Sequence, residues 1–221
     1  MSTYIVAAVT DYFKKNIKTK NFYFINTKKK LNFKYVSAIK PKIIFFPHWN
    51  WKINNKILNH YLCIGFHSTP LPYGRGGSPV QNMIVRGYKS STVCAIKLES
   101  KLDSGPIYLK KKFKLNDRAE IIFKKIYKII FIMIFALVKK IPNPKNQLGK
   151  SSNFKRRKPY ESDIGNLQSL NEIYDYIRML DTGIKNYPLA FVSTPNFTIQ
   201  FHHAKKHKKF VTAQTIIKMK N

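Results

Sequence analysis

The sequence predicts an α/β fold in which an open, mostly parallel sheet carries helices on both faces and a small α+β appendage follows at the C-terminus. Short apolar runs alternate with helical patterns as far as residue 141, and this alternation builds parallel sheets through crossover helices. Two of the runs, KIIFFP (42–47) and LCIGF (62–66), are apolar throughout, as strands covered on both faces are. The hydrophobic content of 44% and the aromatic content of 14% suffice for a proper core.

Local signals place the individual elements. A helix is predicted over 78–87, because Ser78 can cap it, Pro79 fits its first position and Gly87 fits its end. The longest helix is predicted from Asp117 to about residue 141, since the proline that follows cannot continue it. The other expected elements are strands at 4–9, 22–25, 91–99 and 106–115, a helix at 53–61 and a brief helix at 12–16.

Composition divides the chain into three parts: an α/β domain over 1–141, a connector over 142–169 and a small α+β subdomain over 170–221. Pro, Asn, Gly, Ser and charged residues dominate the connector, which is typical of linking segments. In the last part, 170–180 has apolar residues at helical spacing, whereas 197–203 and 210–219 are expected to be strands.

The chain is strongly basic, with 41 Lys and Arg against 10 Asp and Glu and a formal net charge of +31. Such a charge is compatible with a nucleic acid or another acidic partner. The lysines are spread from end to end and accompany abundant Asn and Ile, as in a chain encoded by AT-rich codons. We favour this compositional explanation and leave the nucleic-acid explanation open.

Two cysteines, Cys63 and Cys94, lie in apolar runs and are expected to be buried free thiols in a reducing compartment, so we expect a cytoplasmic protein. The longest apolar run, 129–138, is too short to span a bilayer, and we expect no membrane association. The histidines at 202, 203 and 207 stand among lysines without a cysteine. We therefore expect no metal there, with a metal site as the weaker alternative.

The stretch FHSTPLPYGRGGSPVQN (66–82) differs from the rest of the chain, because it combines one His with three Pro and three Gly and contains no Lys. It is not a P-loop, since no GK[ST] follows the glycines, and its spacing is not that of the dinucleotide fingerprint. In open α/β sheets, ligands bind beyond the carboxyl ends of strands. His67, the loop at 47–51 and Asp103 are all expected at that edge.

HSTPLPYGRGGSP (67–79) and LDSGP (102–106) together resemble the folate-dependent formyltransferases in order and spacing. The likeness extends from about residue 42 to 141 and fits the N-terminal strands more loosely. The resemblance implies a Rossmann-like fold and the transfer of a formyl group from 10-formyltetrahydrofolate to a primary amine, without a metal. It also implies that His67 is the catalytic histidine and Asp103 its acidic partner. A protonated imidazole can stabilise the tetrahedral oxyanion, and a carboxylate can help to remove the proton of the attacking amine.

The chain departs from the family at one position. The family has Asn two residues before the catalytic His, as a donor to the oxyanion, whereas this chain has Gly65. Losing such a donor costs roughly a hundred- to a thousandfold in rate in other enzymes. Asn82 is the candidate replacement, and His48 is the second.

The resemblance also implies a donor-binding region, because the loop after residue 46 lies where the family packs on the pterin. A flat heterocycle needs an apolar wall, which Trp49 can supply together with Trp51, although the core is an equally good place for either ring. The residues assigned to donor binding are Pro47, His48, Trp49, Leu71, Pro72, Gly76 and Gly77.

The acceptor amine is less defined than the donor. The segment FKRRKPYESDI (154–164) and the segment at 174–191 resemble sugar-nucleotide formyltransferases. The favoured acceptor is therefore an amine on a nucleotide-linked amino sugar. Three arginines, Arg156, Arg157 and Arg178, can bind its phosphate or, equally well, form salt bridges that dock one domain on another. Other functions remain open: methionyl-tRNA as the acceptor, a degenerate folate or nucleotide binder without activity, or a basic RNA-binding module. A homodimer also remains open.

Overall fold

A computed structural model describes residues 2–184 and 187–220, and these pack as two compact units. The first unit contains Met1–Arg75, Thr92–Lys112 and Ile126–Asn153, and the second contains Gly76–Ser91, Phe113–Lys125 and Phe154–Asn221. The boundaries expected after residues 141 and 169 stay a prediction.

The main sheet has six strands in the order β2-β1-β3-β4-β6-β7. The pairs β1–β2, β1–β3 and β3–β4 are parallel, which confirms the mostly parallel α/β sheet. The strands are β1 (Tyr4–Ala7), β2 (Phe22–Ile25), β3 (Ile43–Phe46), β4 (Cys63–His67), β6 (Ser90–Lys97) and β7 (Ile107–Lys114). Every residue of β1 and β3 is buried, as expected for strands that are covered on both faces.

Short helices connect these strands, and a long one follows them. They are α1 (Tyr12–Asn16), α2 (Phe33–Ile39), α3 (Asn55–His60) and α5 (Ala119–Lys139). The sequence analysis did not predict α2, because its seven residues carry no clear apolar period. Local chemistry defines it instead: the Asn32 side chain accepts a hydrogen bond from the Tyr35 N–H, and Lys40 ends the helix in the left-handed region.

One strand runs against the others, which the sequence analysis did not foresee. Strand β6 is antiparallel to β4, with His67 opposite Cys94 and Ile64 opposite Lys97. The end of β6 therefore lies beside the start of β4, away from the edge that carries His67. The segment between β6 and β7 must fold back for Asp103 to reach that histidine.

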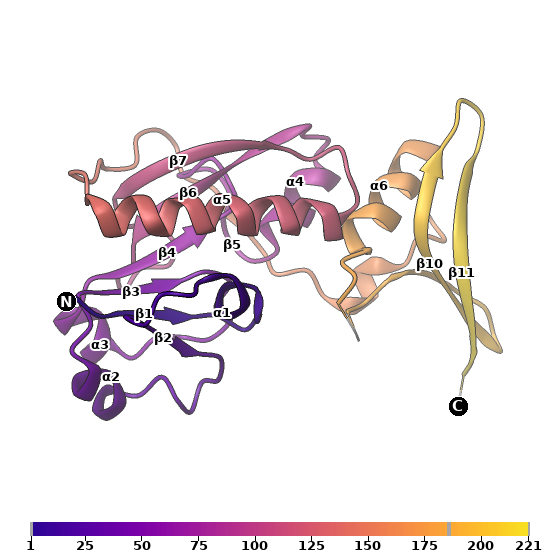
Figure 1. Cartoon of the computed structure of the whole chain (residues 1–221). Coiled ribbons are helices and arrows are strands. Elements are labelled where there is room, and N and C mark those ends of the chain that lie inside the picture. Colours follow the sequence, from indigo (N-terminus) through magenta and orange to yellow (C-terminus); the bar gives the residue numbers. More distant parts are fainter. Residues whose placement is uncertain (1, 185–186, 221) are drawn as a thin grey trace. The chain divides into compact units, whose positions relative to one another are not determined.

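The second unit combines two helices with a three-stranded antiparallel sheet, and its helix α6 packs against both α4 and β10. Strands β10 and β11 form a long hairpin (Figure 1). The elements are α4 (Pro79–Val85), the 3-10 helix η1 (Pro159–Ser162), α6 (Leu170–Leu180), β9 (Ala190–Ser193), β10 (Phe197–Lys206) and β11 (Val211–Met219).

One expectation for the loop regions was wrong in detail. Ser78 does not cap α4 with its side chain; it lies in the left-handed region, and its hydroxyl accepts the Arg157 N–H. The segment predicted as a connector also forms strand pairs. It contributes β8 (Asn153–Phe154), which pairs with β5 (Arg75–Gly76), and Lys145 forms an antiparallel bridge to Ile107.

Candidate functional site

His67 and Asp103 lie together in the first unit. The Nδ1 atom of His67 is 3.4 Å from the Asp103 carboxylate, and the side chains are 8% and 14% exposed. The other ring nitrogen, Nε2, lies 2.8 Å from the Gly74 carbonyl oxygen. Because a carbonyl can only accept, Nε2 carries a proton in this contact. Both ring nitrogens thus face oxygen atoms, which fixes the plane of the imidazole.

The loop that carries Asp103 is tightly constrained. Asp103 has a φ of +49°, a conformation that Asp tolerates better than most residues. Two residues later, Gly105 packs so closely that a Cβ there would overlap the Lys97 carbonyl. The turn LDSGP thus has a physical reason for its glycine, because no side chain fits against the end of β6.

Gly65 lies in the strand that ends at His67, and the space beside it is filled. A Cβ at this position would lie 2.5 Å from the Cδ2 atom of Leu98, and φ here is not positive. Leu98 packs against the surrounding core cluster. Apolar packing therefore replaces the polar side chain that the resemblance leads us to expect.

The loop after β3 provides one histidine and two tryptophans. His48 has a φ of +59°, and its Nδ1 lies 2.7 Å from the Tyr127 hydroxyl, whose pKa burial raises to about 12. Trp49 packs edge-on against Phe46 and Trp51. Its buried Nε1 has no hydrogen-bond partner among the residues that the structure describes. Pro47 is buried, whereas Trp51 is 38% exposed.

In the proline- and glycine-rich loop, close approach by the chain itself explains the glycines. Leu71 and Pro72 are buried and joined by a cis peptide bond. Gly76 has a φ of +102°, and a Cβ there would meet the Phe154 carbonyl at 2.5 Å. A Cβ on Gly77 would meet the Arg156 backbone at 2.6 Å. Close contacts with residues 154–156 therefore account for the glycines at positions 76 and 77.

Asn82 lies on α4 in the second unit and is 6% exposed. Its amide nitrogen donates to the carbonyls of Gly77, Ser78 and Lys155, at 3.0, 3.1 and 3.0 Å. Its Oδ1 accepts from Arg86 at 2.8 Å. To donate to a reacting oxygen, the Asn82 amide would have to give up its hydrogen bond to one of these carbonyls.

The arginines considered as phosphate ligands differ in their surroundings. Arg178 is 3% exposed, its Nε lies 2.6 Å from Asp175, and its Nη1 donates to the carbonyls of Leu115 and Asp117. Arg157 donates to the Glu161 carbonyl and lies over the ring of Tyr176. These two side chains form contacts within the second unit, and of the three arginines only Arg156 is exposed.

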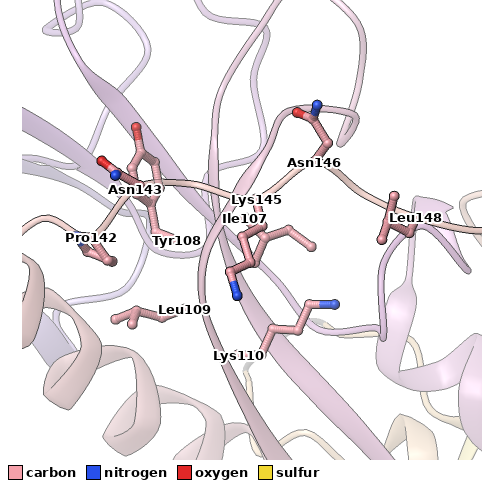
Figure 2. A pocket seen from close by; sticks show the side chains of 9 residues that line it. All are labelled: Ile107, Tyr108, Leu109, Lys110, Pro142, Asn143, Lys145, Asn146 and Leu148. Carbon is pink, nitrogen blue, oxygen red and sulfur yellow. The ribbon is translucent and has the colours of Figure 1, made fainter.

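Two cavities are found away from His67 and Asp103. One, of about 440 Å³, lies between β7 and the segment after α5 (Figure 2). The other, of about 580 Å³, lies in the second unit between residues 181–184 and 187–189 on one side and strands β10 and β11 on the other. Geometry and resemblance, not cavity size, therefore identify the candidate site.

Other expected features can be compared with the described residues. Cys63 and Cys94 are buried free thiols, and burial raises their pKa values, that of Cys63 to about 12. Over residues 2–184 and 187–220, no group of three or more His, Cys, Asp or Glu side chains could hold a metal ion. Over the same ranges, no helix is long and apolar enough to cross a bilayer.

Comparison with known proteins identifies the family. The solved structure of a methionyl-tRNA formyltransferase from Clostridium thermocellum is 38% identical, covers 100% of both chains and superposes with a TM-score of 0.92. The family model of the methionyl-tRNA formyltransferase C-terminal domain matches residues 159–218. This chain therefore belongs to the formyltransferase family.

Curated relatives match over shorter stretches. The methionyl-tRNA formyltransferase of Rickettsia canadensis (strain McKiel) is 38% identical over 85 residues, 38% of this chain and 28% of the relative. The bifunctional polymyxin resistance protein ArnA of Wigglesworthia glossinidia brevipalpis is 31% identical over 166 residues, 71% of this chain and 25% of the relative. The matches thus span about a quarter of these relatives.

More distant structures show the fold alone. HypX from Aquifex aeolicus, solved in complex with tetrahydrofolic acid, is 11% identical with a TM-score of 0.76, and the match covers 94% of this chain and 38% of HypX. A sugar N-formyltransferase from Shewanella is 15% identical with a TM-score of 0.71, and the match covers 95% of this chain and 100% of that one.

Proposed function

We propose that this protein transfers the formyl group of 10-formyltetrahydrofolate to the amine of methionyl-tRNA. The contact between His67 and Asp103 carries the proposal, because it joins a ring N–H donor and a carboxylate in a site that is nearly closed to solvent. A buried donor acts strongly on developing charge. The family supports 10-formyltetrahydrofolate as the formyl donor, and Pro47, His48, Trp49, Leu71, Pro72, Gly76 and Gly77 remain the proposed donor-binding residues.

The proposed reaction needs no oxidant or metal. The amine nitrogen attacks the formyl carbon, and the π electrons of the carbonyl move to its oxygen. For this step the Nε2–H of His67 exchanges its hydrogen bond to the Gly74 carbonyl for one to that oxyanion, and Asp103 accepts the proton that the amine loses. When the bond between carbon and N10 breaks, its electron pair stays on N10, which takes up that proton. The products are the N-formyl amine and tetrahydrofolate.

Three observations favour methionyl-tRNA as the acceptor over the amino sugar that the sequence favoured. The relative that covers the whole chain and the family model for 159–218 both carry the methionyl-tRNA description. In addition, the turn of the β10–β11 hairpin is basic and exposed, with Lys205, Lys206, Lys208 and Lys209. Clustered lysines attract a phosphate backbone. Burial of Arg178 removes one of the arginines considered for a nucleotide-sugar phosphate.

An acceptor panel tests this proposal. The protein is incubated with 10-formyltetrahydrofolate and, in separate reactions, with methionyl-tRNA or with nucleotide-linked amino sugars. Mass spectrometry should detect formylmethionyl-tRNA, in a reaction that slows as salt increases. Formylation of a sugar amine alone would establish the second candidate. Donor binding without a formylated product from any acceptor would support the degenerate binder instead.

Asn82 is the proposed replacement for the donor absent at Gly65, and Asn82→Ala separates this role from a structural one. We expect the free energy of unfolding to fall by about 2 kcal/mol, because three partly buried hydrogen bonds are lost. If Asn82 also stabilises the oxyanion, turnover falls about a hundredfold while the Kd of the formyl donor changes little. If the variant, measured well below its unfolding temperature, turns over as fast as the wild type, Asn82 is not the oxyanion donor and His48 becomes the candidate for that role.

A polar side chain introduced at Gly65 tests, in the opposite direction, whether the site lacks a donor to the oxyanion. Gly65→Asn alone should destabilise the protein, because its Cβ overlaps Leu98. Combining it with Leu98→Ala makes room, and the double variant should turn over at least about tenfold faster than Leu98→Ala alone. A double variant that is folded and no faster than that control would show that the site does not lack a donor.

A further inference from the structure

We infer that Gln147 is a positioning residue that keeps two loops in register: the loop at 68–75, whose Gly74 carbonyl contacts His67, and the loop at 98–106, which carries Asp103. This inference rests on the proposed function. Gln147 lies in the segment that sequence composition assigned to a connector. Its side chain is half-buried in the first unit, where both loops also lie. Its hydrogen bonds are to backbone carbonyls of the Asp103 loop and to the Arg75 guanidinium, so it acts through the two loops.

The amide of Gln147 uses its full hydrogen-bonding capacity. Its Nε2 donates to the carbonyls of Asp103 and Gly105, at 2.8 and 2.9 Å. Its Oε1 accepts from Nε and Nη2 of Arg75, at 3.2 and 2.7 Å. A side-chain amide has two N–H donors and two acceptor lone pairs. All four are therefore engaged, half with each loop.

Each end of this bridge leads to one member of the pair. Asp103 is itself bound at its carbonyl and sits at a φ of +49°, a conformation that surrounding contacts must hold. On the other side, Arg75 follows Gly74, whose carbonyl lies 2.8 Å from His67 Nε2. Catalysis depends on sub-ångström placement of the reacting groups. By holding both loops, the Gln147 amide therefore controls the geometry of the contact between His67 and Asp103.

The same segment holds the glycine loop a second time. The Ser152 hydroxyl accepts the Gly74 N–H at 2.9 Å, and the Ser152 carbonyl accepts the Arg75 N–H at 2.9 Å. These bonds secure only the loop that contacts His67. Gln147 is the residue whose side chain reaches both loops.

Two variants remove the bridge in different ways. Gln147→Leu removes all four hydrogen bonds at similar size. Gln147→Glu keeps the acceptor for Arg75 but sets a carboxylate oxygen against the carbonyls of Asp103 and Gly105. Both should lower kcat by about 10- to 100-fold with little change in the KM for 10-formyltetrahydrofolate. Gln168→Leu is the matched control, because that exposed glutamine donates only to the nearby Asn166 carbonyl, and it should retain full activity.

A double-mutant cycle distinguishes positioning from a general structural role. In the Asp103→Asn background, Gln147→Leu should cause no further loss of kcat, because the carboxylate that it positions is gone. Losses that multiply independently would overturn the inference.

Hydrogen exchange tests the bridge without relying on activity. In Gln147→Leu, backbone amides of residues 99–105 should exchange faster than in the wild type, and Gln168→Leu should leave them unchanged. Unchanged exchange in Gln147→Leu would overturn the inference even in an active enzyme. A wild-type protein that formylates no acceptor would overturn the proposed function, while the exchange result would still decide the role of Gln147.

Discussion

His67→Ala, Asp103→Asn and the double variant are each expected to lose formyl transfer by about a thousandfold. The two side chains are buried and in contact, so removing either one disables the other, and the second substitution adds little. Single-turnover rates with saturating 10-formyltetrahydrofolate measure this directly. The affinity for the donor should largely survive His67→Ala.

The matched control for this experiment is His60→Ala, since His60 is an exposed histidine that hydrogen-bonds the nearby Lys56 carbonyl and packs edge-on against Phe33. It should behave as the wild type. Losses that multiply in the double variant would mean that His67 and Asp103 act independently, and a fully active His67→Ala would exclude the site.

Gly105→Ala is expected to have the largest effect among the substitutions outside the pair. Its Cβ would overlap the Lys97 carbonyl, which belongs to the backbone and cannot move aside as the end of a flexible side chain could. The loop must shift and carry Asp103 away from His67. We expect a loss of about 3 kcal/mol in the free energy of unfolding and a fall in turnover of about a hundredfold.

Gly165→Ala provides the comparison, because its Cβ would meet only the Asp163 carboxylate oxygen, at 3.2 Å, and its φ is not positive. Thermal unfolding and turnover of both variants separate a general glycine effect from the specific one. A Gly105→Ala protein as stable and active as Gly165→Ala would contradict the packing of this loop.

The sequence was sufficient for the features that follow from local pattern. The apolar runs predicted β3 and β4 as buried strands, and Pro142 predicted the end of the long helix within a few residues. The motifs HSTPLPYGRGGSP and LDSGP, taken as a pair, also predicted that His67 and Asp103 lie close together. Each of these signals is written in consecutive residues.

The sequence did not predict what depends on distant contacts. The antiparallel β6 is set by pairing between β4 and a strand thirty residues later, and alternation of elements gave no sign of it. Leu98 beside Gly65 depends on that same pairing. Gln147 was overlooked because its polar neighbours are typical of a linker, and only the folded chain shows that it bridges two loops.

The central claim is tested most directly by following one formyl group. The wild-type protein and His67→Ala are each given 10-formyltetrahydrofolate, with its formyl carbon isotopically labelled, and methionyl-tRNA. The account predicts that the wild type releases one tetrahydrofolate for each labelled formylmethionyl-tRNA formed, and that His67→Ala forms about a thousandfold less per unit time. Labelled product at equal rates from both proteins, or none from the wild type with any amine, would contradict it.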